Sequence, residues 1–204
     1  MKRFSIVGIL ALLAVASFTT LPLNAAQGPP NVKAPASYKV AFDTSAGKFV
    51  VAVTRSNAPH GADRLYSMVK AKYFDGDRFY RVVPNFVVQW GGAAKPAVTA
   101  LWSATIPDDP VKGTNARGTL SFAATGEPNS RSTHMFVNLV DNARLDGMGF
   151  APVGKVVSGM STVDKIYAGY GENPDQALIA SQGNVYLIAQ FPKLDYIKTA
   201  RIVQ

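Results

Sequence analysis

One arginine stands among apolar residues in a way that could serve a peptide ligand. Arg81 and Gln89 both carry side-chain N–H donors, and the run between them contains Phe86. Further along the chain, Phe136 and Leu145 add large apolar side chains next to turn-rich segments. A guanidinium above an apolar hollow suits a ligand that offers a hydrophobic ring and a carbonyl. A proline within a peptide offers both.

Such a site could support rotation about the bond that precedes a proline. The barrier to this rotation is ~18–20 kcal/mol, and uncatalysed exchange takes roughly tens of seconds or more. Rotation destroys the amide resonance, so the proline nitrogen becomes pyramidal and regains its lone pair. A fixed donor aimed at that nitrogen stabilises the twisted amide more than the planar one. This chemistry needs no nucleophile, metal or general base, and we expect Arg81 to carry it.

The composition argues against several other kinds of site. The sequence has no cysteine, which rules out a disulfide framework, a thiol nucleophile and a thiolate zinc site. It has two histidines, His60 and His134, so we expect neither a histidine-built metal site nor a cofactor. The formal net charge is +8, but the lysines and arginines are scattered along the chain. We therefore expect a solvated basic surface rather than a nucleic-acid groove.

Most of the segments that must position these residues have the pattern of strands. Runs of this kind occupy residues 38–42, 48–53, 118–123, 135–139, 152–157, 184–188 and 196–203, and residues 78–89 add two strands around a turn. Helical spacing is found at 59–72 and at 161–167. Residues 91–111, with their prolines, have the pattern of a loop. The sequence therefore predicts a mainly β fold, an antiparallel barrel or sandwich covered by two helices.

The first residues have the pattern of the leader of an exported protein. Lys2 and Arg3 form a short positive region, residues 6–18 are apolar, and Ala25 and Ala26 suit cleavage. The apolar run is too short to span a bilayer, which favours a signal peptide over a membrane anchor. We expect residues 1–26 to be a signal peptide, 27–37 a proline-rich lead-in and 38–204 one folded domain.

Several segments, taken in order, resemble the cyclophilin family of peptidyl-prolyl isomerases. Residues 79–89, with the sequence FYRVVPNFVVQ, are similar to the family's active-site signature. Residues 118–123, 129–138 and 145–156 resemble the core strands and loops that follow it, and residues 171–196 resemble a bacterial subgroup. The resemblance covers nearly all of residues 38–203. It implies a closed eight-stranded antiparallel barrel with two covering helices.

The resemblance implies a role for each matching residue. Arg81 would be the transition-state donor, with Tyr80 beside it as a substrate-binding residue and Gln89 holding both the arginine and the substrate. The proline pocket would be formed by Phe86, Val87, Phe136 and Leu145; Ala123 and Ala124 would line the groove for the substrate backbone, with His134 as a donor and Phe150 at the rim. Because side chains alternate along a strand, the pattern leaves open whether Val87 or Val88 faces the pocket.

Three positions on the wall opposite Arg81 depart from the family pattern. His134 stands where the family usually has glutamine, Ala124 where it often has asparagine, and Arg144 where many members have an aromatic residue. His134 could be a substrate donor, a pH-sensitive element or a residue with no separate role. These departures keep a second hypothesis open, a proline-peptide binding module or chaperone with little catalysis.

The leader and the resemblance together define the expected activity. We expect a cis–trans isomerase that assists the folding of exported proteins in the periplasm of a Gram-negative bacterium. Its partners would be proline-containing polypeptides, and it would act as a monomer. After removal of the leader, it would bind neither a membrane nor nucleic acid.

Overall fold

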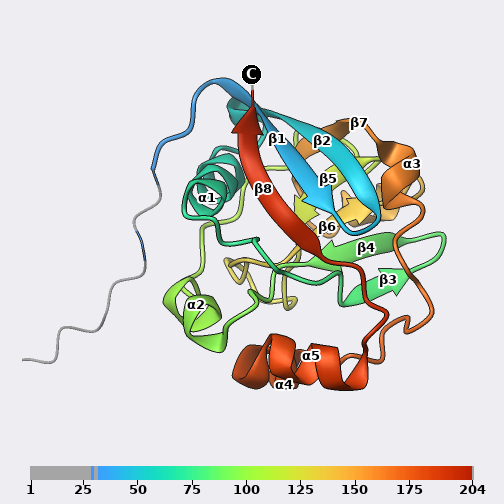
Figure 1. Ribbon diagram of the computed structural model, residues 1–204. Coiled ribbons are helices and arrows are strands. Elements are labelled where there is room, and N and C mark those ends of the chain that lie inside the picture. The colour runs from blue at the N-terminus through green and yellow to red at the C-terminus, as the bar shows by residue number, and fades with distance from the viewer. Residues whose placement is uncertain (1–28, 30–31, 204) are drawn as a thin grey trace, which may run out of the picture.

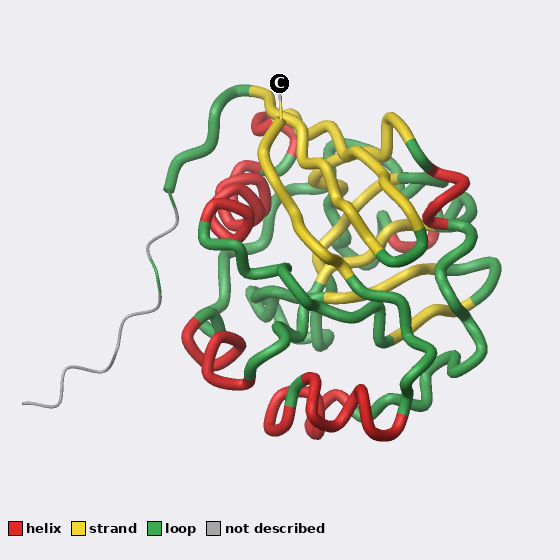
Figure 2. Tube along the Cα trace, in the orientation of Figure 1, coloured by secondary structure: helices red, strands yellow, loops and turns green. Residues whose placement is uncertain are grey.

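Eight antiparallel strands form one curled sheet in the computed structural model, which describes residue 29 and residues 32–203 (Figures 1 and 2). In chain order, the strands are β1 (Ser37–Thr44), β2 (Gly47–Thr54), β3 (Arg81–Val83), β4 (Val87–Trp90), β5 (Thr119–Phe122), β6 (Met135–Asn138), β7 (Pro152–Ser158) and β8 (Ile197–Val203). Across the sheet, their order is β3-β4-β6-β5-β7-β2-β1-β8. The prediction of a mainly β, eight-stranded antiparallel fold is confirmed.

Alternation along the strands directs every second side chain into the interior of the curl. Val40 and Phe42 of β1 and Phe49 and Val51 of β2 are buried, whereas the residues between them are partly exposed. The Phe42 and Phe49 rings stack with their centroids 4.8 Å apart, and both meet the buried Trp90 edge-on. Burying one such side chain contributes about 1.5–3 kcal/mol. This core therefore fixes the strands whose other face carries the site.

The expected closed barrel is not observed, because the outer strands β3 and β8 are not paired with each other in the described part of the chain. The sheet is a curled half-barrel. The segments just before these strands do meet, since the Phe79 N–H donates to the Asp195 carbonyl over 3.0 Å. Further along, the Val82 N–H of β3 donates instead to the Gly171 carbonyl of a loop, over 3.1 Å. The loop thus occupies a position on the free edge of β3 that a closing strand would need.

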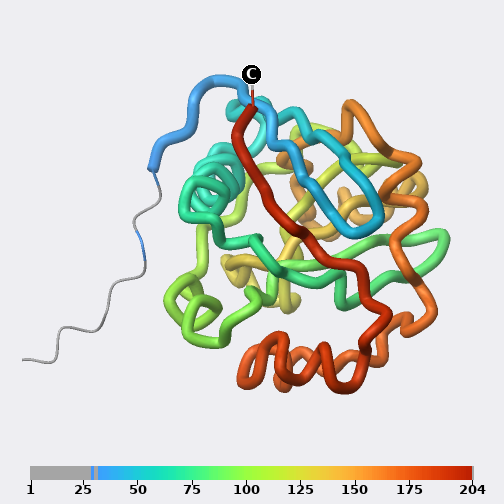
Figure 3. Tube along the Cα trace, viewed as in Figure 1, coloured from blue at the N-terminus to red at the C-terminus, as the bar shows by residue number. Residues whose placement is uncertain are grey.

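The first and last strands are neighbours (Figure 3). β1 pairs with β2 on one side and with β8 on the other, from Lys39 opposite Val203 to Thr44 opposite Ile197. The helix after β2 also packs against β8. The sheet therefore joins the two ends of the described chain in one place.

More helices accompany the sheet than the two expected. They are α1 (Pro59–Lys70), α2 (Pro96–Leu101), α3 (Met160–Val163), α4 (Gln176–Gln182) and α5 (Asn184–Gln190), with 3-10 turns η1 (Arg55–Asn57) and η2 (Ala143–Leu145). In Figure 1, α1 lies beside β8, and α4 and α5 lie together below the sheet. None of the helices in the described part of the chain has the length and apolar character needed to cross a membrane.

Two of these helices lie where the sequence predicted another structure. α2 lies in the segment predicted to be a loop, and it begins at Pro96, where the missing N–H of proline costs a helix nothing. α5 replaces the strand predicted at 184–188, which was wrong. Gly183, with a φ of 56°, turns the chain between α4 and α5, and the Asn184 side chain donates to the Gly76 carbonyl over 2.9 Å. These contacts with distant segments outweigh the strand preference of the apolar run.

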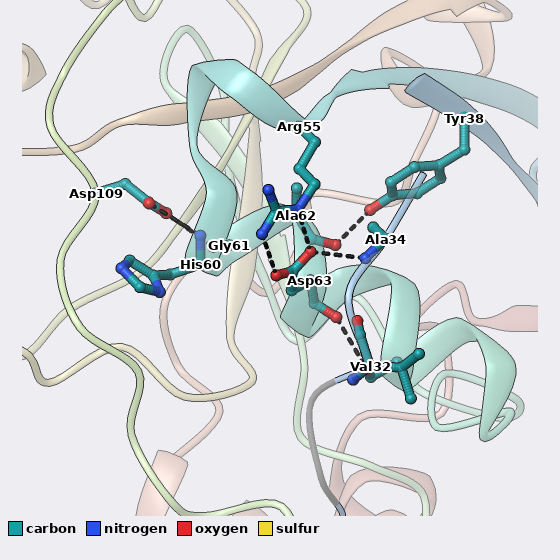
Figure 4. A network of polar contacts seen from close by, with 10 residues as sticks. Val32, Ala34, Tyr38, Arg55, His60, Gly61, Ala62, Asp63 and Asp109 are labelled. Carbon is teal, nitrogen blue, oxygen red and sulfur yellow. Dashed lines mark hydrogen bonds and ion pairs between the residues drawn. The ribbon is translucent and has the colours of Figure 1, made fainter. Parts of the chain in front are cut away.

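Asp109 supplies the cap that the sequence around α1 lacks (Figure 4). The N-cap residue, Ala58, has no side chain that could accept from the first turn. Asp109 instead accepts from the His60 N–H over 2.9 Å and from the Gly61 N–H over 2.8 Å. A carboxylate at this end of a helix satisfies free N–H groups and is attracted by the helix dipole. The start of α1 is therefore held by a residue from a distant loop.

The described end of the predicted lead-in is fastened to the same helix (Figure 4). The Ala34 N–H donates to the Asp63 carboxylate over 2.8 Å, and Arg55 donates twice to that carboxylate over 2.7 Å. The Val32 N–H donates to the Ser67 hydroxyl over 2.7 Å. This part of the lead-in thus belongs to the folded body. The predicted signal peptide, residues 1–26, lies outside the described residues.

One buried carboxyl group in the described part of the chain accepts no hydrogen bond of normal length and angle. It belongs to Asp77, just before β3, which is 0% exposed. Burial raises its pKa to about 8, and the nearby N–H groups of Gly91 and Arg78 lower it only in part. The Asp77 carboxyl is therefore largely protonated at neutral pH.

Candidate active site

A row of paired residues runs across four strands on the outer face of the sheet. Arg81 of β3 is opposite Gln89 of β4, Gln89 is opposite Phe136 of β6, and Phe136 is opposite Ser121 of β5. Directly opposite residues on neighbouring strands project from the same face. The same alternation turns Val88 into the core and leaves Val87 on the side of the row. Residues far apart in sequence therefore stand next to one another.

The turn between β3 and β4 follows from Pro84 and Asn85. The Phe86 N–H donates to the Val83 carbonyl over 3.0 Å, and Asn85 has a φ of 60°. Proline at the second position and a residue with positive φ at the third suit a type II turn. The turn brings Phe86 back beside Arg81, whose guanidinium carbon lies 5.6 Å from the centre of the ring.

These residues border a pocket of about 340 Å³. The pocket is lined by Arg81, Phe86, Val87, Gln89, Ala123, Ala124, Thr125, Ser130, Ser132, His134, Phe136, Leu145, Met148, Phe150 and Gln176. The rings of Phe136 and Phe150 meet edge-on with their centroids 5.7 Å apart. Apolar walls with a few polar groups are typical of a site for a small ligand. The lining includes every residue predicted for the site except Tyr80.

Tyr80 lies beneath the pocket, 1% exposed, and joins its two sides through hydrogen bonds. Arg81 Nη1 donates to Gln89 Oε1 over 2.9 Å. Gln89 Nε2 donates to the Tyr80 hydroxyl over 2.6 Å, and that hydroxyl is 2.8 Å from His134 Nδ1. The structure therefore corrects the expectation that Tyr80 touches the substrate. Its position is that of a buried link between Gln89 and His134.

This chain of donors assigns the protons of His134. Because Gln89 donates to the Tyr80 oxygen, the Tyr80 hydroxyl hydrogen is free to point at His134 Nδ1. The neutral ring then carries its hydrogen on Nε2. Burial lowers the pKa of His134 to about 4, so the ring is uncharged at neutral pH. The histidine can therefore act as a neutral donor, and its own titration lies below the range of a neutral-pH switch.

Residues 39–182 match the family model described as cyclophilin type peptidyl-prolyl cis-trans isomerase/CLD. This chain belongs to the cyclophilin family. A peptidyl-prolyl cis-trans isomerase A from Dickeya dadantii is 34% identical over 166 residues, which cover 79% of this chain and 86% of the relative. A peptidyl-prolyl cis-trans isomerase from Acinetobacter baylyi is 36% identical over 136 residues, 64% of this chain and 72% of the relative.

Solved structures share the fold of this cyclophilin. A cyclophilin-type isomerase from Cryptosporidium parvum has a TM-score of 0.62 at 19% identity, covering 82% of this chain and 98% of that one. A crystal structure from the same organism, determined in the presence of the dipeptide Ala-Pro, also has a TM-score of 0.62, at 18% identity, covering 81% and 99%. At these identities, the likeness concerns the fold alone.

Two further arginines border the aromatic walls of this cyclophilin: Arg131, which the sequence did not single out, and Arg144, which was expected on the wall opposite Arg81 but contacts the same Phe86 ring as Arg81. Arg131 is buried, forms an ion pair with Asp108, and places its guanidinium carbon 5.5 Å from the centre of the Phe150 ring. The exposed Arg144 lies 4.8 Å from the centre of the Phe86 ring. No local sequence signal marks these contacts, because loops distant in sequence make them. In the described part of the chain, no group of His, Asp and Glu side chains is arranged as metal ligands.

Removing the Tyr80 hydroxyl is expected to destabilise the protein and weaken catalysis together. In Tyr80→Phe, Gln89 Nε2 and His134 Nδ1 both lose a buried partner. We expect the free energy of unfolding to fall by about 1–3 kcal/mol, measured by urea denaturation. Isomerisation should also slow, because Gln89 is no longer fixed against Arg81.

The matched control is Tyr38→Phe. It removes another buried hydroxyl, which donates to the Ala62 carbonyl over 2.6 Å away from the pocket. This variant should lose stability without losing activity per folded molecule. If Tyr80→Phe behaves in the same way as Tyr38→Phe, the link between Gln89 and His134 does not support catalysis.

Proposed function

We propose that this cyclophilin isomerises X–Pro bonds by donating hydrogen bonds from Arg81 to the proline nitrogen as the amide twists. The observation that carries the proposal is the placement of the Arg81 guanidinium at the edge of an apolar pocket, held there by Gln89 Oε1 over 2.9 Å. The pyramidal nitrogen of the twisted amide has a lone pair that the planar amide lacks. A donor oriented beforehand therefore lowers the barrier to rotation.

The remaining pocket residues suit a proline-containing polypeptide as the substrate. Phe86, Phe136 and Leu145 offer apolar contacts to a proline ring, and His134 offers a neutral N–H to a peptide carbonyl. The Cryptosporidium parvum cyclophilin studied with Ala-Pro supports this substrate class by analogy.

The activity is tested with a peptide whose cis and trans X–Pro isomers can be distinguished. The wild-type protein should accelerate their exchange in proportion to its concentration, without changing the final cis fraction. A proline-binding module would bind the peptide without accelerating the exchange. The exchange would then keep its uncatalysed time constant of roughly tens of seconds or longer. That second result would overturn the proposed activity.

We also propose a location and a class of substrate proteins. The enzyme assists the folding of exported proteins in a bacterial periplasm. The support is the leader pattern of Lys2 and Arg3, an apolar run at 6–18, and Ala25–Ala26. The full chain, expressed in a Gram-negative bacterium, should appear in the periplasmic fraction with its N-terminus just after Ala25 or Ala26. A chain that starts at Gln27 after an initiator methionine should stay in the cytoplasm. Full-length chain that keeps Met1 in the cytoplasmic fraction would contradict the proposal.

A further inference from the structure

The guanidinium of Arg81 has a second partner, on the edge opposite to Gln89. Glu172 Oε1 lies 2.6 Å from Arg81 Nε and 2.5 Å from Nη2. Gln89 accepts from Nη1. The hydrogen bonds to these two partners use the N–H on Nε and one N–H on Nη1, and Nη2 forms the ion-pair contact with Glu172. The remaining N–H groups of the five on a guanidinium belong to Nη1 and Nη2.

The position of Glu172 follows from the loop that covers the free edge of β3. The Gly171 carbonyl accepts from Val82 N–H over 3.1 Å, which sets Glu172 beside Arg81. On the other side, Asp175 accepts from the first N–H groups of α4 over 2.7 and 3.1 Å. The Tyr170 ring packs against Phe191 with the centroids 5.1 Å apart. The loop is thus anchored before and after the glutamate.

Glu172 contacts Arg81 without forming part of the pocket wall. Arg81 lines the pocket and Glu172 does not. The carboxylate can therefore hold the arginine without taking the place of a substrate. The Arg81 side chain is 25% exposed and that of Glu172 is 61% exposed, so solvent screens the pair and its strength should depend on salt.

We infer that Glu172 is a positioning residue, which together with Gln89 fixes the guanidinium of Arg81 so that its remaining N–H groups face the proline. The inference deepens the proposed function and rests on it. Glu172 and Gln89 are far apart in sequence, and the segment around Arg81 that resembles the family signature ends at Gln89. The loop that carries Glu172 reaches the site only through the fold.

The test compares Glu172→Gln with Glu127→Gln, using an uncharged proline peptide. Glu127 is the only other glutamate in the sequence, is exposed, and does not line the pocket, so its substitution makes the same change of charge. We expect Glu172→Gln to lower kcat by about two- to fivefold with little change in KM, the range of an exposed ion pair. Glu127→Gln should leave both constants unchanged, and urea midpoints should show that both variants are folded.

The dependence of the isomerisation rate on salt separates a role in positioning Arg81 from a merely structural role, which would not make the rate depend on salt in this way. Raising NaCl from about 0.1 to 1 M shortens the screening length from ~10 to ~3 Å. The wild-type rate should then fall toward that of Glu172→Gln, whereas the rate of Glu172→Gln should change little. In an Arg81→Ala background, assayed at higher protein concentration, Glu172→Gln should have no further effect.

Three results would overturn the inference. The first is equal loss in Glu172→Gln and Glu127→Gln, which would indicate a general effect of charge. The second is a faster Glu172→Gln, which would mean that the carboxylate competes with the substrate for Arg81. The third is unchanged kinetics in Glu172→Gln. If instead Arg81→Ala alone retains full activity, the proposed role of Arg81 fails, and that outcome is separate from all three.

Discussion

Replacing Arg81 with alanine is expected to lower kcat/KM for a proline peptide by about two to three orders of magnitude, the usual cost of losing one oriented transition-state donor. This corresponds to about 3–4 kcal/mol of barrier. The guanidinium is already held by Gln89 and Glu172, so it needs little reorganisation as the amide twists. Because the planar amide offers no comparable lone pair, the loss should fall on kcat rather than on KM.

Two further variants separate the possible roles of Arg81. Arg81→Lys keeps a positive charge but loses the planar fork, and should fall between alanine and wild type. Arg117→Ala removes an arginine that is paired with Asp164 and does not line the pocket, and should leave the rate unchanged. An Arg81→Ala variant as fast as wild type would contradict the mechanism. A change in KM alone would show that Arg81 binds the planar substrate.

Replacing Asp77 with asparagine is expected to stabilise the protein strongly at alkaline pH and hardly at all in acid. The folded-state pKa of Asp77 is raised to about 8 by burial, whereas an unfolded aspartate titrates near 3.9. Below about pH 4, the carboxyl is protonated in both states and has no effect on this balance. Between about pH 4 and 8, only the unfolded chain gives up the proton, so the free energy of unfolding falls by about 1.4 kcal/mol per pH unit.

The amide that Asp77→Asn introduces cannot ionise, so the variant escapes this loss. We expect Asp77→Asn to exceed wild type by roughly 3–5 kcal/mol near pH 8 and to match it near pH 4, measured by urea denaturation across this range. Other carboxyl groups titrate in both proteins and cancel in the comparison.

Asp75→Asn is the control of opposite sign. Partial burial of Asp75 works against ionisation, but hydrogen bonds from Arg201 and Ala200 outweigh it and lower the pKa. Stability from Asp75 is therefore present above the unfolded pKa and is lost as the pH falls, so its asparagine variant should be the less stable protein at neutral pH. Parallel stability curves for wild type and Asp77→Asn would contradict the account of the buried carboxyl.

The strands and most of the site could be predicted because their signals are local. Val40 and Phe42 alternate with Lys39, Ala41 and Asp43, and this period of two indicates which face is buried. The residues from Arg81 to Gln89 lie in one hairpin, so a single segment carries both hydrogen-bonding groups. The hypothesis that Phe86, Phe136 and Leu145 share a pocket rested on the family resemblance, and all three line one pocket.

The errors arose where distant contacts decide the structure. Val185, Leu187 and Ile188 have the pattern of a strand, yet only Leu187 is buried, and the segment forms a helix whose first residue, Asn184, donates to the distant Gly76 carbonyl. Tyr80 was expected to bind the substrate, but it is 1% exposed and packs with Ile179, Leu187 and Leu194, which lie much later in the chain. Glu172 was missed because it meets Arg81 across an interval of 91 residues.

The pairing of β1 with β8 has a consequence for the order in which the molecule can be built. Lys39 lies opposite Val203, so the first strand obtains one of its two neighbours only after residues 197–203 have been synthesised. Contacts between such distant residues slow folding, because a long loop must close before the contact is gained. Until then β1 is an exposed strand edge to which other chains could add. A protein proposed to speed the folding of others therefore has a sheet that is complete only after all eight of its strands have been synthesised.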